Sequence, residues 1–152
     1  MEIKTFHDLI DWTRSLHHRT AACLAQSATE HEGVRAQALL DYLATHETEL
    51  EKTVEGFEND GDVRALKTWI YDYLSDSPIK THRTCDSPYT KLDFNGIARE
   101  IFDFHDQVIA LYQNLEERAD IPEARELAEN LLNLERHEAM RMAREVGRMQ
   151  DI

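Results

Sequence analysis

Four long segments of the chain repeat their apolar residues at the spacing of an α-helix. In each segment, apolar side chains recur every three or four residues, which places them on one face of a helix. Breaks in the pattern agree, because turn-forming residues follow the first segment and Pro122 suits the first turn of the last one. We therefore expect an all-α chain with helices over residues 4–27, 32–58, 92–118 and 122–149.

The connections between these segments differ greatly in length. Residues 59–91 separate the second and third segments, whereas the other two connections are short. Within the long connection, residues 65–74 predict a short aromatic-rich helix, followed by a loop that contains Pro78 and Pro88. We therefore predict one domain over residues 1–152, in which two helical hairpins are joined by a crossover rather than arranged as a simple up-and-down bundle.

An internal repeat supports two equivalent hairpins. Shifting the first half of the chain by 88 residues aligns the apolar stripes in residue class, for example Phe6 with Phe94. The same shift places His17 on His105 and Glu47 on Glu135. We interpret the match as equivalence of the hairpins and not as proof of a duplication.

Polar side chains interrupt the apolar stripes near the middle of each helix. At about 100° per residue, Glu135 and Glu138 lie about 60° apart and face the apolar side, whereas His137 and His18 point to solvent. The midpoints of antiparallel helices meet in one layer. The residues expected to converge there are His17, Glu47, His105 and Glu135, with His46 and Glu138 nearby.

Carboxylates in an apolar core need compensation. An isolated buried charge costs several kcal/mol even after relaxation, so it must be paired, protonated or bound to a cation. A divalent metal would neutralise the glutamates and accept imidazole lone pairs. Pairs of protonated histidine and ionised glutamate would serve equally well without a metal, and both interpretations stay open.

Through its two hairpins, its long crossover and its mid-helix Glu and His residues, the chain resembles the ferritin-like superfamily, in particular the small rubrerythrin-like non-haem di-iron bundles. That family takes one Glu from each of helices one and three, and Glu-x-x-His from each of helices two and four. Glu47 and Glu135 match the family's glutamates, but Leu50 and Glu138 stand where its histidines belong. His17 and His105 stand in place of the other two glutamates. The ligand set therefore departs from the one that supports ferroxidase or peroxidase activity.

The resemblance implies a four-helix bundle with a metal centre. Iron is the expected metal, with one or two ions, and manganese or zinc are alternatives. The ligands would be His17, Glu47, His105 and Glu135, with His46 and Glu138 in or next to the site. Oxygen or peroxide chemistry, or iron handling, is the activity that the resemblance implies.

Other functions remain open from the sequence. A metal-free bundle with a structural His/Glu cluster would act by association as a homodimer. The aromatic cluster of Trp69, Tyr71 and Tyr73 is expected to cap the bundle, and a dimer contact is the alternative. Hemerythrin-like and DinB-like bundles are further alternatives, although the stripes lack the His-x-x-x-His pairs that they use. No nucleophile–base pair or phosphate-binding glycine loop is visible.

Charge and composition exclude some partners. A net charge of −13 and a pI near 4.9 argue against binding to nucleic acid or anionic membranes. The chain shows no leader-like or membrane-spanning apolar run, so we expect a cytoplasmic protein. Two cysteines are too few for a disulfide framework, and we expect Cys23 to be a buried thiol and Cys85 a loop thiol. His82 and Cys85 have the spacing of half a zinc site, without a second pair nearby.

Overall fold

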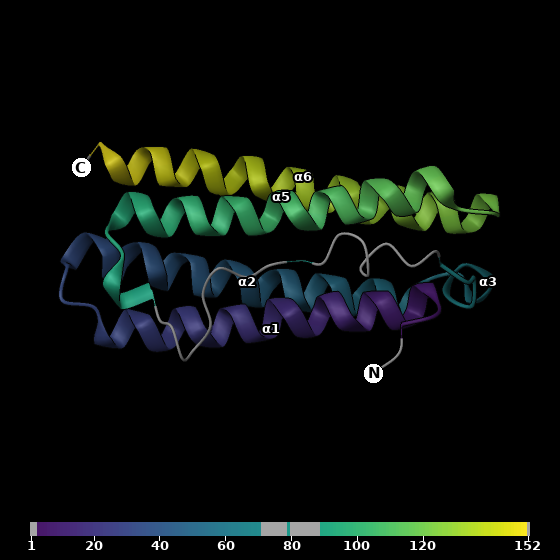
Figure 1. Ribbon diagram of the computed structural model, residues 1–152, viewed down its shortest axis with the longest axis horizontal. Helices are drawn as coiled ribbons and strands as arrows, with labels where there is room; N and C mark the ends of the chain where they lie inside the picture. The colour runs from purple at the N-terminus through teal and green to yellow at the C-terminus, as the bar shows by residue number, and fades with distance from the viewer. Residues whose placement is uncertain (1–2, 71–78, 80–88, 152) are drawn as a thin grey trace.

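The computed structural model describes residues 3–70, 79 and 89–151, and within these ranges the chain is helical (Figure 1). The described part contains four long helices, one single-turn helix and one 3-10 turn. In chain order these are α1 (Phe6–Glu30), α2 (Val34–Asp60), α3 (Val63–Leu66), η1 (Tyr89–Lys91), α5 (Phe94–Arg118) and α6 (Pro122–Gln150). The predicted all-α class is confirmed.

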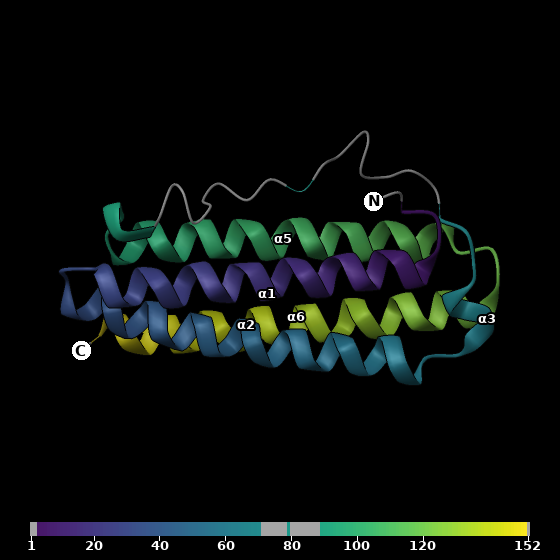
Figure 2. The same ribbon diagram turned by 90° about the horizontal axis from the view of Figure 1, so that it is seen from below.

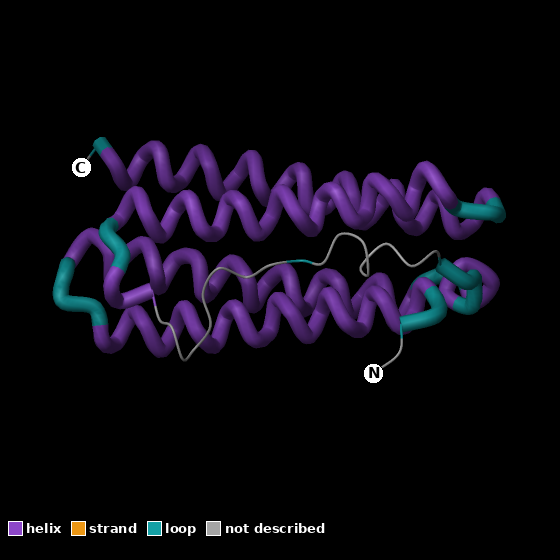
Figure 3. The backbone as a smooth tube through the Cα atoms, in the orientation of Figure 1, coloured by secondary structure: helices purple, strands orange, loops and turns teal. Residues whose placement is uncertain are grey.

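The four long helices lie side by side along the length of the molecule. α1 and α2 run antiparallel as one hairpin, and α5 and α6 form the second (Figure 1). The view turned by 90° places α1 beside α5 and α2 beside α6 (Figure 2). α3 lies at one end of the molecule and η1 at the opposite end, so α1 and α5 run in opposite directions (Figure 3). This layout brings all four midpoints to the same level.

Capping side chains set the first residues of two long helices. Thr5 precedes α1, where its hydroxyl accepts a hydrogen bond from the Asp8 amide at 3.2 Å and its own amide donates to the Asp8 carboxylate. Asp93 similarly accepts a hydrogen bond from the Gly96 amide at 2.8 Å before α5. Both helices therefore begin two residues later than the apolar spacing predicts, because the cap residues stand outside the helix.

Replacing Thr5 by alanine should test the cap of α1. The substitution removes the hydroxyl that satisfies the Asp8 amide, so the free energy of unfolding should fall by about 1 kcal/mol. Chemical denaturation of the two proteins measures the difference. Thr53→Ala is the matched control, because Thr53 is exposed within α2 and bonds only to a carbonyl of its own helix. A loss no greater than that of the control would contradict a capping role.

The first helix continues past the break that the sequence predicts near Ser27. α1 extends to Glu30, and Ser27 is buried within it. The Ser27 hydroxyl accepts a hydrogen bond from the backbone amide of Tyr89 at 3.2 Å. A serine that would favour a turn in isolation is thus used for a contact between α1 and η1, and the helix runs on.

The aromatic-rich segment differs from the predicted helix over 65–74. α3 ends at Leu66, and Trp69 instead forms an isolated antiparallel bridge with Thr5. Backbone groups on either side of Trp69 bond to the N-terminal segment, which removes them from any continuing helix. Trp69 is 66% exposed. Tyr71, Tyr73, Pro78 and Pro88 lie outside the described residues.

The apolar core is divided in two by a polar layer. One part lies toward the end of the molecule where α3 lies. It includes Phe6, Leu9, Ile10, Val54, Val108, Leu111 and Leu131. The other lies toward the opposite ends and includes Leu24, Leu39, Leu43, Ile97, Ile101 and Met142. Buried polar residues separate these two parts. In the described chain, no helix has a stretch that is long and apolar enough to cross a membrane.

Candidate functional site

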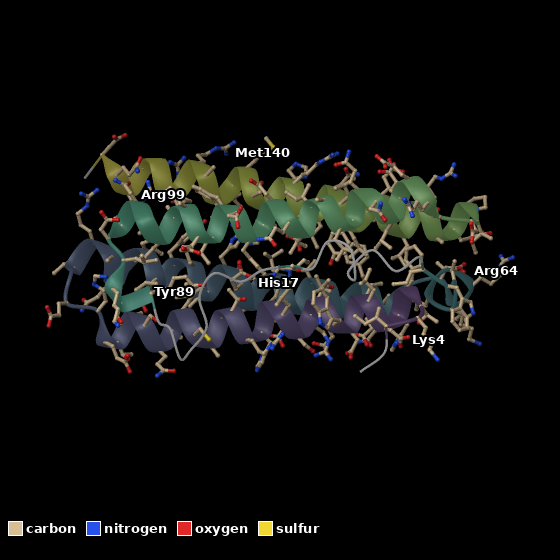
Figure 4. The ribbon with its side chains drawn as sticks, viewed as in Figure 1. Lys4, His17, Arg64, Tyr89, Arg99 and Met140 are labelled. Carbon is tan, nitrogen blue, oxygen red and sulfur yellow. The ribbon has the colours of Figure 1, made fainter. Side chains whose placement is uncertain are left out.

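The polar layer at mid-height is formed by one residue from each long helix. His17 belongs to α1, Glu47 to α2, His105 to α5 and Glu135 to α6. All four side chains are completely buried. Figure 4 labels His17 about halfway along the packed helices. The structure therefore brings together the four residues that helix phase and mid-helix position predict to converge.

These four side chains form a closed hydrogen-bonded ring, which we call the His/Glu ring. His17 Nδ1 lies 2.6 Å from Glu47 Oε2, and His17 Nε2 lies 2.8 Å from Glu135 Oε1. His105 Nδ1 lies 3.2 Å from Glu135 Oε2, and His105 Nε2 lies 2.5 Å from Glu47 Oε1. Every ring nitrogen thus faces one carboxylate oxygen, and every oxygen faces one nitrogen.

The ring repeats the symmetry of the two hairpins. Within each hairpin, Nδ1 of the histidine contacts Oε2 of the glutamate in the same hairpin. Between the hairpins, Nε2 of each histidine contacts Oε1 of the glutamate in the other hairpin. The 88-residue shift exchanges these contacts pairwise, because it maps His17 on His105 and Glu47 on Glu135. As a result, each glutamate directs one oxygen to His17 and its other oxygen to His105.

The ring is electrically neutral when both histidines are protonated. A neutral imidazole can donate from only one nitrogen, so four N–H donors require two imidazolium ions facing two carboxylates. Burial opposes charge on the histidines, but attraction to Glu135 and Glu47 outweighs it and raises the pKa of His17 to about 10. The same balance raises the pKa of His105 to about 9.

The glutamates shift in the complementary direction. Burial favours their neutral form, yet attraction to the two histidines prevails and lowers the pKa of Glu135 to about 2. The pKa of Glu47 is lowered for the same reasons. The buried charges therefore compensate one another, as a carboxylate in an apolar core requires.

His46 and Glu138 lie next to the ring. His46 is 3% exposed, and its Nδ1 stands 3.6 Å from Glu138 Oε2, beyond hydrogen-bond length. Burial lowers the pKa of His46 below its ordinary value. Within the described ranges, His46 Nε2 is buried without a hydrogen-bond partner. Glu138 is 21% exposed and lies 3.8 Å from Arg141, so it is only partly turned to the core.

Tyr112 and Thr13 extend the polar layer in a way that the sequence pattern did not indicate. The Tyr112 hydroxyl donates to Thr13 Oγ1 at 2.9 Å, and Thr13 donates to the Ile10 carbonyl. Burial and the nearby Glu135 charge raise the pKa of Tyr112, so the phenol stays neutral. In the sequence, both residues fit the apolar stripes of their helices. Nothing in their spacing indicates that their hydroxyl groups bond to each other.

The two histidines predicted to face solvent do so. His137 is exposed on α6. His18 is also exposed, and its Nδ1 contacts Glu51 at 3.0 Å on the outside of the hairpin. Phasing the helices therefore separates the buried histidines from the surface ones correctly.

The contacts of the ring are pairwise rather than directed at a shared centre. In the described part of the chain, no group of three or more His, Cys, Asp or Glu side chains is arranged to hold a metal ion as it stands. The four ring residues instead meet nitrogen to oxygen.

The expectation of a free, buried thiol at Cys23 is wrong. Cys23 is half-buried and disulfide-bonded. Two cysteines are too few for a framework of several disulfides, but they are enough for a single bridge. The chain's other cysteine, Cys85, and the neighbouring His82 lie outside the described residues.

Comparison of the chain with protein-family models, with curated proteins and with solved structures finds no match.

Proposed function

We propose that this protein is a ferritin-like four-helix bundle that binds divalent cations at the His/Glu ring. The observation that carries the proposal is the division of the carboxylate oxygens. Each glutamate turns one oxygen to each imidazole, so each imidazole stands beside one oxygen from Glu47 and one from Glu135. A cation that replaced the proton at one nitrogen of each imidazole would therefore have that nitrogen and a carboxylate oxygen as its first donors.

The donor types fit the metals that the resemblance implies. Imidazole nitrogen with carboxylate oxygen suits iron, manganese and zinc, and all donors come from rigid mid-helix positions. The hydrogen-bonded ring is then the metal-free state, in which protons on His17 and His105 stand where the cations would bind. Binding would need one nitrogen from each imidazole, so a cation must displace protons from His17 and His105. A bound iron or manganese ion would supply one-electron chemistry toward oxygen or peroxide.

The four positions match the family pattern in part. Glu47 and Glu135 stand at the glutamate positions of helices two and four, and His17 and His105 replace the glutamates of helices one and three. With histidine in place of glutamate at two positions, the site has two carboxylates, whose charge balances that of the two protonated histidines. Iron handling, or oxygen or peroxide chemistry, is accordingly the class of function that we propose. Assembly as a homodimer stays a prediction.

Metal titration tests this function. The purified, metal-free protein should bind two equivalents of Mn²⁺ or Fe²⁺ per chain and should release about two protons per filled ring, because both imidazolium ions lose one. Calorimetry in buffers of different ionisation enthalpy measures the protons, and elemental analysis measures the metal. Glu135→Gln should abolish both equivalents, since Glu135 contacts both histidines.

His137→Ala is the matched control for that variant, because His137 lies on the same helix but is exposed. It should bind metal as the natural protein does. If iron, manganese and zinc all fail to bind and Glu135→Gln changes only stability, the ring is a structural ion-pair cluster of a metal-free bundle.

A further inference from the structure

The symmetry of the His/Glu ring is broken at one place. His46 and Glu138 lie beside the ring, and the 88-residue shift pairs them with Leu134 and Leu50. Leu50 is 2% exposed and Leu134 is partly buried, so the equivalent positions around the other histidine are apolar. One side of an otherwise symmetrical site is therefore polar, and the other is not.

His46 belongs to the His105 side of the ring. The centres of the His46 and His105 rings lie 6.1 Å apart at a steep angle of 67°. Phe104 does not distinguish the two histidines, because its ring lies 5.3 Å from that of His105 and 5.8 Å from that of His17. For usual metal–nitrogen distances of about 2.0–2.1 Å, two imidazoles on one cation have ring centres roughly 4.5–6.5 Å apart. The spacing of His46 and His105 falls within that range.

His46 is also buried with one ring nitrogen, Nε2, that has no hydrogen-bond partner among the described residues. Its Nδ1 is too far from Glu138 Oε2 for a hydrogen bond at 3.6 Å, and its Nε2 meets no partner in the part of the chain that the structure describes. Buried polar groups are normally paired, and an imidazole that is not paired has a lone pair to give to a ligand. The ring of Tyr42 lies 6.0 Å from that of His46, at an angle of 32°.

We infer that His46 is a second imidazole ligand for the cation held at His105, and that the two cation positions therefore differ. This inference rests on the proposed function. Glu138 follows Glu135 by three residues on α6, is partly exposed and points an oxygen toward His46. It is the carboxylate through which the His105 position exchanges its cation with solvent. The His17 position has neither group, because Leu134 and Leu50 stand at the equivalent places.

Titration with Co²⁺, whose visible spectrum reports its ligands, distinguishes the two positions. The natural protein should bind two equivalents with unequal affinities. His46→Leu should retain one equivalent unchanged and weaken the other at least tenfold. Glu138→Gln should slow the uptake of that same equivalent several-fold. Leu134→Ala, at the symmetry-related position, and His137→Ala, on the exposed face, are controls that should change neither equivalent.

The outcomes separate this inference from the function on which it rests. If the natural protein binds two equivalents and His46→Leu leaves both unchanged, the role of His46 is overturned while the metal site stands. If the natural protein binds none, both proposals fail. Should His46→Leu fold poorly, the ¹⁵N resonance of the His46 ring in the natural protein gives the answer. Addition of Zn²⁺ should shift it strongly, and an unmoved signal overturns the inference.

Discussion

Glu47→Ala should remove about 3–5 kcal/mol from the free energy of unfolding, the largest effect expected of any single substitution in the chain. Glu47 is completely buried and contacts both His17 and His105 at 2.6 and 2.5 Å. Its loss leaves two buried imidazolium ions facing one carboxylate. Guanidinium denaturation, with the midpoint and slope compared, measures the change.

Replacing the whole ring should have a very different effect. In the variant His17→Leu, Glu47→Met, His105→Leu, Glu135→Met, no buried charge is left unpaired, and apolar side chains of similar volume fill the layer between the two core clusters. The free energy of unfolding should equal that of the natural protein or exceed it by about 1–4 kcal/mol, because the desolvation of four charges no longer opposes folding.

The pair of variants distinguishes a functional ring from one that stabilises the fold. Glu49→Ala is the control, because Glu49 is exposed on the same helix and its loss should change the free energy by no more than about 0.5 kcal/mol. If the fourfold variant is as unstable as Glu47→Ala, the ring contributes net stability, and its presence needs no cation to explain it.

The second large effect is the pH dependence of the metal-free protein. The free energy of unfolding should be greatest between about pH 4.5 and 6.5 and should decline on both sides, by several kcal/mol on the alkaline side. His17 and His105 have pKa values raised from 6.5 to about 10 and about 9. Their contribution is fully present below pH 6.5 and is lost as the pH rises through those values.

The acid side follows from the glutamates. The pKa of Glu135 falls from 4.5 to about 2, and that of Glu47 is also lowered. Their contribution is present above pH 4.5 and is lost as the pH falls toward 2. Urea denaturation in the presence of a chelator should be measured at pH 3, 5.5, 7.5 and 9.5. The fourfold variant lacks the ring but keeps the other charged residues, so comparing it with the natural protein separates the effect of the ring from that of the overall charge. If the free energies of unfolding of the two proteins changed with pH in the same way, the ring would not be the cause of the pH dependence.

The sequence was sufficient to predict where the long helices lie and which polar residues meet. The period of the apolar residues fixes the phase of each helix, and the phase decides that Glu135 faces inward and His137 outward. Because the hairpins are antiparallel and of similar length, mid-helix residues must share one layer. No side-chain detail is needed to place His17 and Glu47 in that layer.

The pairing within the layer could not be predicted in the same way. Which nitrogen faces which oxygen depends on side-chain rotamers, and those are set by packing between hairpins that are distant in sequence. The 88-residue shift carried a signal for the symmetry of the contacts, but not for the contacts themselves. The unpartnered Nε2 of His46 is likewise a property of three-dimensional surroundings.

Tertiary contacts also overrode local signals elsewhere. The aromatic segment after Leu66 has helical spacing, yet the backbone next to Trp69 pairs with residues near Thr5, and that pairing ends α3. Ser27 looked like a turn residue, and its contact with Tyr89 keeps it inside α1. Propensity is a weak prior in both cases, because a long-range partner changes the balance.

Anomalous diffraction from crystals grown with Mn²⁺ tests the central claim most directly. The account predicts two peaks in the polar layer, each about 2.0–2.3 Å from a nitrogen of one histidine and from a carboxylate oxygen of Glu47 or Glu135. The four residues would then have exchanged their hydrogen bonds for ligand contacts. A map at saturating Mn²⁺ with no peak in the layer, and with His17 and His105 still bonded to the glutamates, would contradict it.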